Sequence, residues 1–166
     1  MSHTLDVDFI NPFIDGAITT LAIQCKVKAT PGKPFLKGDA VSPEMITDIA
    51  GIIGITSDKF QGSITIAFPE KTFLAVMSNM LGETFTSITP DMQDGAGELT
   101  NIIFGSAKKV LNERGYTIQK ALPSVVSGSG VKINSVSNAP AIVLPFSTDV
   151  GEFKIEISFD PKKENE

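Results

Sequence analysis

Two stretches of alternating apolar and polar residues, about 91 positions apart, constrain the fold of this 166-residue chain more than any other feature. Each follows a short polar turn, Ser57-Asp58 in one case and Thr148-Asp149 in the other. Apolar side chains at every second position predict a β-strand with one buried face. The matching apolar residues are Ile64, Ile66 and Phe68 in the first stretch and Ile155, Ile157 and Phe159 in the second. The sequence thus predicts two hairpins and an internal repeat, unless any two alternating hairpins would align equally well.

Three other segments have the apolar spacing of helices. The first covers residues 11–24, where Asn11 would be the N-cap and Pro12 the first helical residue. The second covers residues 70–81, with Gly82 as its stop, and the third, which is longer, covers residues 89–115. The predicted strands cover residues 25–29, 48–56, 61–68, 117–128, 130–135, 140–148 and 151–159.

This content predicts an α+β fold in which helices pack on a mostly antiparallel sheet, because both hairpins join neighbouring strands directly. A chain of this length normally forms one domain. We therefore expect a single domain over residues 1–160, followed by a charged C-terminal tail at residues 161–166.

The charge balance excludes some classes of function. The chain has 14 basic and 19 acidic residues and a net charge of -5, so the broad basic surface that nucleic-acid binding requires is not expected. No apolar run approaches the roughly 20 residues of a membrane helix, and the N-terminus has neither the basic nor the apolar region of a signal peptide. We expect a cytoplasmic protein that binds neither nucleic acid nor membranes.

The single histidine, His3, and the single cysteine, Cys25, limit the chemistry further. One thiol cannot close an internal disulfide or complete a zinc cluster, and one histidine near a terminus argues against Ser-His-Asp catalysis and histidine-based metal sites. The glycine-rich stretch 127–130 lacks the pattern of a phosphate-binding loop and is predicted to be a turn. Catalysis would therefore depend on carboxylates, amides, hydroxyls or lysines.

The predicted third helix has two stripes at helical spacing. The apolar stripe predicts the face that packs on the core, and it consists of Met92, Ala96, Leu99, Ile103, Ala107 and Val110. The polar stripe predicts an exposed face, and it consists of Asp94, Glu98, Asn101, Gly105, Lys108 and Asn112. The helix also contains three glycines, each of which costs about 0.5–1 kcal/mol relative to alanine in a helix interior. Helix propensity alone does not explain this sequence.

Gly105 lies one helical turn after Asn101 and leaves bare backbone beside that amide. Another macromolecule would then be able to approach closely enough for Asn101 to enter a cleft. The alternative is that the glycines allow close packing within the chain, and that Glu98 and Asn101 are ordinary solvated residues. The E-x-x-N spacing by itself does not decide between the two.

The same segment resembles a known family. GAGELTNIIFGSAKKV, followed by PSVVSGSGVKINS and preceded by GIIGITSDKFQGSITIAF, is similar to the CheC/CheX/FliY group of chemotaxis phosphatases and most similar to its CheX-type members. The motif D-x-x-x-E-x-x-N corresponds to Asp94, Glu98 and Asn101, with Pro123 some twenty residues later. The resemblance extends from the first predicted helix to the last strand. It implies the family fold, in which long helices pack across a sheet with internal pseudo-twofold symmetry.

The resemblance also implies an activity, the hydrolysis of the phosphorylated aspartate of a response-regulator receiver domain such as CheY. It implies that Asn101 enters the active site of the receiver and orients the attacking water, while Glu98 pairs with the receiver's active-site lysine. The Mg²⁺ of this chemistry belongs to the receiver, so no cofactor of the chain's own is expected. Asp94, Gly105 and Lys108 are expected at the partner-binding surface, unless Asp94 instead caps the helix start.

The first half of the chain retains only part of the motif. Asp8 and Asn11 align with Glu98 and Asn101, but Pro12 predicts that the helix begins there, which would leave Asp8 outside it. We therefore expect one intact site. The resemblance further implies a homodimer, and strand 151–159 is able to pair with another chain if it lies at a sheet edge.

Two other functions stay open. One is a non-catalytic module that docks a receiver or a component of the flagellar switch, and the other is a structural dimer with a vestigial site. The intact E-x-x-N favours the enzyme, because a module that only docks has no need of the amide.

Overall fold

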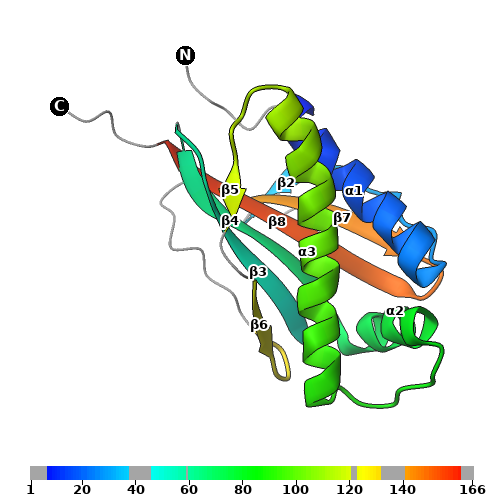
Figure 1. The fold of residues 1–166 in the computed structure, drawn as a ribbon. Helices are drawn as coiled ribbons and strands as arrows, with labels where there is room; N and C mark the ends of the chain where they lie inside the picture. The colour runs from blue at the N-terminus through cyan, green and yellow to red at the C-terminus, as the bar shows by residue number, and fades with distance from the viewer. Residues whose placement is uncertain (1–6, 38–45, 59, 121–122, 132–140, 162–166) are drawn as a thin grey trace.

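One sheet with helices across one of its faces makes up the fold of this computed structural model (Figure 1). The structure describes residues 7–37, 46–58, 60–120, 123–131 and 141–161. Within them, eight strands form a single sheet in which every pair is antiparallel. The predicted α+β class and the mostly antiparallel sheet are confirmed.

The sheet has the order β1-β7-β8-β4-β3-β5, with β2 also pairing with β7 and β6 with β3. The strands are β1 (Thr30–Pro31), β2 (Phe35–Leu36), β3 (Ile49–Thr56), β4 (Phe60–Phe68), β5 (Gln119–Lys120), β6 (Ser124–Ser127), β7 (Ile142–Thr148) and β8 (Gly151–Pro161). β4 and β8 therefore lie at the centre. Strand β8 is paired on both sides, so it is not at an edge and the condition for pairing it with another chain is not met.

The three helices are α1 (Val7–Cys25), α2 (Glu70–Leu81) and α3 (Pro90–Glu113). α1 and α3 run across the same face of the sheet (Figure 1). α2 packs against α1 and β8, and the sulfur of its Met77 lies close to Gly95 of α3. The predicted second and third helices are confirmed, and the predicted stop at Gly82 is a left-handed residue with φ of 72°.

The core lies between the helices and the sheet. The apolar residues of β4 and β8 point into it, as the alternation predicts, and the aromatic rings of Phe68, Phe146 and Phe153 stack there. On α3, five residues of the predicted apolar stripe are buried, whereas Val110 is only half-buried. Burial raises the pKa of the Cys25 thiol to about 11, so this thiol stays protonated at neutral pH.

The two hairpins have equivalent registers. In the β3–β4 hairpin Ile53 lies opposite Ile64, and in the β7–β8 hairpin Leu144 lies opposite Ile155. Each residue of the second pair stands 91 positions after its counterpart in the first. The internal repeat stays a prediction, which these registers support.

The predicted start of the first helix is wrong. α1 begins at Val7, so Pro12 lies inside the helix and Asp8 lies in its first turn. Proline has no N–H to donate to the carbonyl four residues earlier, which here is Asp8. Nη1 of Arg114 donates to that carbonyl at 2.6 Å and replaces the missing hydrogen bond. The helix thus continues through the proline.

The predicted strand 25–29 is wrong, and the predicted strand 117–128 contains two separate strands, β5 and β6. Residues 25–29 alternate between buried and exposed, but they form no strand, since α1 ends at Cys25 and Lys26 takes a left-handed φ of 53°. The predicted strand 130–135 lies mostly outside the described residues. So does the tail, except that Pro161 ends β8. His3 also lies outside the described residues.

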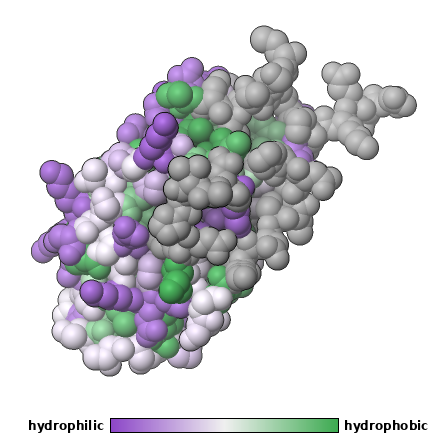
Figure 2. Space-filling view, turned by 180° about the vertical axis from the view of Figure 1, so that it is seen from behind, coloured by the Kyte–Doolittle hydropathy of each residue, from purple (hydrophilic) through white to green (hydrophobic). Residues whose placement is uncertain are grey.

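The other face of the sheet carries a buried carboxylate. Glu156 of β8 lies between the ammonium groups of Lys37 and Lys154, at 3.2 and 3.1 Å. Hydrophilic and hydrophobic residues are interspersed over the described part of the surface seen from behind (Figure 2). This ion-paired cluster connects the edge strand β2 to the central strand.

Asp48, which lies outside α2, caps the N-terminus of this helix. The residue before α2 is Pro69, whose side chain has no oxygen, and Oδ2 of Asp48 accepts the backbone N–H of Glu70 at 2.7 Å instead. Oδ1 of Asp48 accepts the N–H of Gly130 at 3.1 Å, and its carbonyl accepts that of Gly128. The stretch 127–130 is therefore a turn, as predicted, and it is held by a carboxylate of the chain itself.

We expect Asp48→Ala to lower the free energy of unfolding by about 1–3 kcal/mol, because two backbone donors lose their acceptor. Asp48→Asn should cost less, since the amide oxygen is able to replace one of the two acceptor oxygens. Urea unfolding followed by circular dichroism measures both. Asp91→Ala, at an exposed position of α3, is the control, and an unchanged midpoint for Asp48→Ala would contradict the capping role.

Candidate functional site

The motif lies on the outer surface of α3. Asp94, Glu98 and Gly105 are exposed, whereas Asn101 and Lys108 are half-buried. Residues three and four apart on a helix have Cβ atoms about 5–6 Å apart, so Glu98 and Asn101 lie side by side. The structure brings all the predicted site residues to one stripe.

The two carboxylates of this stripe, Asp94 and Glu98, are both exposed on α3. Neither Asp94 nor Glu98 forms a hydrogen bond or ion pair with any residue that the structure describes. The N-cap of α3 is Thr89 and the helix begins at Pro90, so Asp94 is the fifth helical residue and does not cap the helix start. The suggested capping role is wrong, and Asp94 lies exposed on the surface of the helix.

Asn112, the last member of the predicted stripe, has a structural role. Its Oδ1 accepts the backbone N–H of Ile118 at 2.7 Å, and its Nδ2 donates to the carbonyl of the same residue at 3.5 Å. This amide holds the segment that leads from α3 into β5. Asn101 has the same side chain and lies on the same stripe.

The three glycines of α3 have different surroundings. A Cβ on Gly95 would lie 2.7 Å from the sulfur of Met77, and a Cβ on Gly97 would lie 3.6 Å from Cγ2 of Val125. A Cβ on Gly105 would meet no atom within 4 Å. Gly105 also has an ordinary helical φ. Close packing explains Gly95, whereas a Cβ on Gly97 would make only an ordinary van der Waals contact, and nothing in the described part of the chain requires Gly105.

The first-half counterpart lies on a helix as well. Because α1 begins at Val7, Asp8 and Asn11 are three residues apart on the same helix, and both are exposed. Pro123 is half-buried and directly precedes β6. Its side chain lies near Gly97, where it supports α3 and does not reach the stripe.

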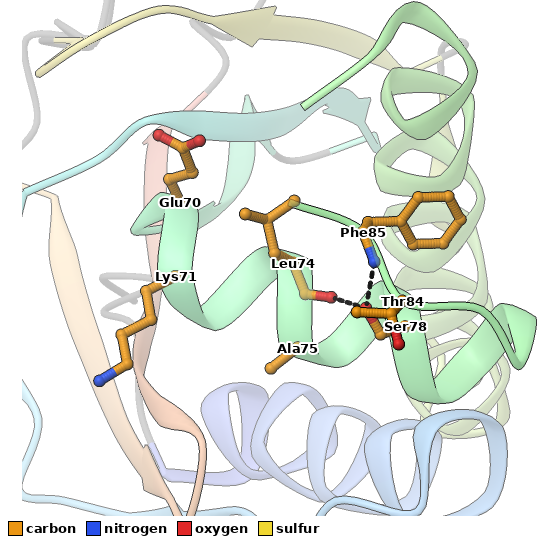
Figure 3. A pocket seen from close by; sticks show the side chains of 7 residues that line it. All are labelled: Glu70, Lys71, Leu74, Ala75, Ser78, Thr84 and Phe85. Atoms are coloured by element: carbon orange, nitrogen blue, oxygen red, sulfur yellow. Dashed lines mark hydrogen bonds between the residues drawn. The ribbon is translucent and has the colours of Figure 1, made fainter. Parts of the chain in front are cut away.

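A pocket of about 600 Å³ lies elsewhere, beside α2 (Figure 3). Its floor is held by Ser78, whose hydroxyl donates to the carbonyl of Leu74 and accepts the N–H of Phe85. The lining residues are Glu70, Lys71, Leu74, Ala75, Ser78, Thr84 and Phe85. None of them belongs to the motif. The predicted site is thus a convex helix surface, which suits insertion into a partner better than enclosure of a small molecule.

Two other kinds of site are absent from the described residues. No group of three or more His, Cys, Asp or Glu side chains there is arranged to hold a metal ion. None of the helices there combines the length and apolar character needed to cross a membrane.

An antiparallel sheet with helices across one face is the fold of CheC-like proteins. A crystal structure of a CheC-like superfamily protein from Shewanella sp. PV-4 has a TM-score of 0.86 and 40% identity, over 93% of this chain and 99% of that one. The chemotaxis protein CheX from Vibrio vulnificus has a TM-score of 0.85 and 35% identity, over 93% of this chain and 100% of that one.

The family model described as chemotaxis phosphatase CheX matches residues 49–147, and the chain belongs to this family. A protein of Thermotoga maritima named CheY-P phosphatase CheX is 26% identical over 132 residues, which are 79% of this chain and 83% of that protein. A structure of the CheX-CheY-BeF3-Mg²⁺ complex from Borrelia burgdorferi has a TM-score of 0.76 and 25% identity, over 93% of this chain and 99% of that one. The resemblance found in the sequence is confirmed.

Proposed function

We propose that this chain hydrolyses the aspartyl phosphate of a CheY-type receiver domain, with Glu98 and Asn101 as its catalytic pair. The observation that carries the proposal is the stripe itself, where exposed Glu98 and half-buried Asn101 stand beside the bare backbone of Gly105. Membership in the CheX family supports it, as do a relative named for CheY-P phosphatase activity and a CheX-CheY complex.

The chemistry needs no nucleophile from this chain. In an acyl phosphate the bond between the phosphorus and the carboxylate oxygen is already activated, so the catalyst has to position a water in line with it. The water oxygen attacks phosphorus, the bond to the aspartyl oxygen breaks, and the products are inorganic phosphate and the aspartate carboxylate. The carbonyl of Asn101 accepts a hydrogen bond from the water, and its NH₂ group donates to a phosphoryl oxygen.

Glu98 fixes the docking register. It carries a full charge one helical turn before Asn101, and it is free of partners among the described residues. Its carboxylate pairs with the active-site lysine of the receiver, which ties the position of Asn101 to the phosphoryl group. Asp94, Gly105 and Lys108 extend the contact along the same stripe. We further propose that Mg²⁺ is bound by the receiver and that this chain supplies no cofactor.

Two properties of the protein belong to the same proposal. Action on a chemotaxis receiver requires the cytoplasm, where the receiver is found. A homodimer follows from the family resemblance, and because β8 is paired on both sides, a dimer built by strand pairing would use the short outer strands instead.

The decay of a phosphorylated CheY-type receiver, with Mg²⁺ present, tests the activity. We expect the chain to accelerate the release of inorganic phosphate over the decay of the receiver alone. Binding to the receiver without acceleration would instead support the non-catalytic docking module, which stays the alternative.

A Gly105→Ala variant is expected to change affinity for the receiver and stability of the fold in opposite directions. We expect the free energy of unfolding to rise by about 0.5–1 kcal/mol, because alanine is the better helix former and no described atom meets the new Cβ. We expect affinity for the receiver to fall by at least about fivefold, since the added methyl group stands where the partner approaches. Thermal unfolding and titration with a phosphorylation-mimicking receiver complex measure the two effects.

Gly95→Ala is the matched control for this variant. It lies on the same helix, but its Cβ would meet Met77, so we expect no gain in stability and unchanged affinity for the receiver. If Gly105→Ala stabilises the chain and leaves the affinity unchanged, Gly105 has no role in docking.

A further inference from the structure

α3 rests on bare backbone directly beside Asn101. Thr100, the preceding residue, is buried over Gly51 of β3. A Cβ built on Gly51 would lie 2.0 Å from Oγ1 of Thr100 and 2.9 Å from its Cβ, closer than side chains approach one another. Gly51 has no left-handed φ, so the position needs a glycine for space and not for backbone conformation.

A second glycine limits α3 from the side. A Cβ on Gly16 of α1 would lie 3.1 Å from the carbonyl oxygen of Ile103 and 3.5 Å from Cβ of Ser106. This contact falls two residues after Asn101, whereas the contact with Gly51 falls one residue before it. The backbones of β3 and α1 therefore limit both the height of α3 above the sheet and its lateral position, next to the predicted catalytic amide.

The side chain of Thr100 is itself held in place. Its hydroxyl donates to the carbonyl of Ala96 at 2.7 Å, which satisfies the buried oxygen and fixes the rotamer. A β-branched side chain with its hydroxyl engaged cannot swing aside to make room. Any group larger than hydrogen at residue 51 therefore has to lift or rotate α3.

We propose that Gly51 and Thr100 are positioning residues for Asn101, an inference that rests on the proposed function. Their contact sets the height and rotation of α3. Consecutive side chains on a helix point in directions about 100° apart, so the position of Thr100 determines the direction in which Asn101 points. An error of about 1 Å in the position of a catalytic group is able to cost about 100-fold in rate.

The experiment uses the full chain and a phosphorylated receiver, and separates kcat from KM. For Gly51→Ala we expect kcat to fall by about 100-fold while KM changes far less, because the surface of α3 still docks but presents the amide wrongly. Thr100→Ala in the Gly51→Ala background removes Oγ1 and Cγ2 from the collision and should recover part of kcat.

Phe146→Leu is the control for lost stability. Phe146 is buried in the core on β7, three strands from β3, so this variant weakens packing without touching the contact under Thr100. We expect it to keep kcat when assayed below its melting temperature. If Gly51→Ala does not fold, Gly16→Ala takes its place, with a smaller loss of kcat because the neighbour has to give only a few tenths of an ångström.

The outcomes are distinct. The positioning role is supported if kcat falls in Gly51→Ala and is partly restored when Thr100→Ala is added. A wild-type kcat in Gly51→Ala, or an equal loss in Phe146→Leu, overturns it. If the unchanged chain does not accelerate decay of the receiver, the proposed function itself fails, and the positioning role fails with it.

Discussion

Replacing Asn101 with alanine is expected to lower turnover of a phosphorylated receiver by at least about 100-fold, the effect of removing one preorganised donor at a reacting oxygen. Affinity for the receiver should change little. The amide orients a water and meets the phosphoryl oxygens mainly as the transition state forms, so its loss raises the barrier more than it weakens the ground-state complex. Phosphate release under single-turnover conditions measures the rate, and binding of the variant is titrated separately.

Asn112→Ala is the matched control, since it removes the same side chain from the same stripe. That amide holds Ile118, so its loss should lower stability and leave turnover intact. Equal loss of turnover in both variants would show that the effect on Asn101 is structural. Unchanged turnover in Asn101→Ala would favour a docking module or a vestigial site.

The arrangement of the main strands and helices follows from local patterns. Alternation over Ile64, Ile66 and Phe68 predicts β4 correctly, because a strand with one buried face has to repeat every two residues. The stop at Gly82 and the apolar stripe of α3 are also local signals, and the structure confirms both, apart from the half-buried Val110. Such features depend on neighbours within one or two turns.

The errors arise where a distant residue changes the local preference. Pro12 is a strong signal for a helix start, but Arg114, 106 positions after Asp8, replaces the hydrogen bond that the proline removes. Residues 25–29 have the alternation of a strand but pair with no strand that the structure describes, and the backbone turns at Lys26. Neither the hydrogen bond from Arg114 nor the backbone turn at Lys26 can be predicted from the neighbouring sequence.

The sequence likewise predicts one part of the candidate site and not the other. The spacing of Glu98 and Asn101 is visible in the sequence, and the helix brings them together as predicted. The contact of Thr100 with Gly51 joins residues 49 positions apart, and a glycine within a predicted strand indicates only that some backbone approaches closely. Likewise, the sequence does not distinguish Gly105 from Gly95 and Gly97, because the difference depends on what lies beside each of them.

Replacing Glu98 with glutamine is expected to weaken binding of the phosphorylated receiver by at least about 30-fold, which corresponds to about 2 kcal/mol, the lower end of the range for truncating one partner of a buried charge pair. The amide has nearly the same shape as the carboxylate, so the change isolates the charge. KM should rise, and kcat at saturating receiver should fall much less, because the pairing with the receiver's lysine forms before chemistry.

Asp91→Asn is the control, because it removes another carboxylate from an exposed position on the same helix but outside the motif. A general effect of acidic charge on steering would weaken both variants and would decline as salt is added. A specific ion pair predicts that only Glu98→Gln loses affinity, mainly through faster dissociation of the complex. If Glu98→Gln instead keeps KM and loses kcat, the carboxylate acts on the reacting groups, and its assignment to docking is wrong.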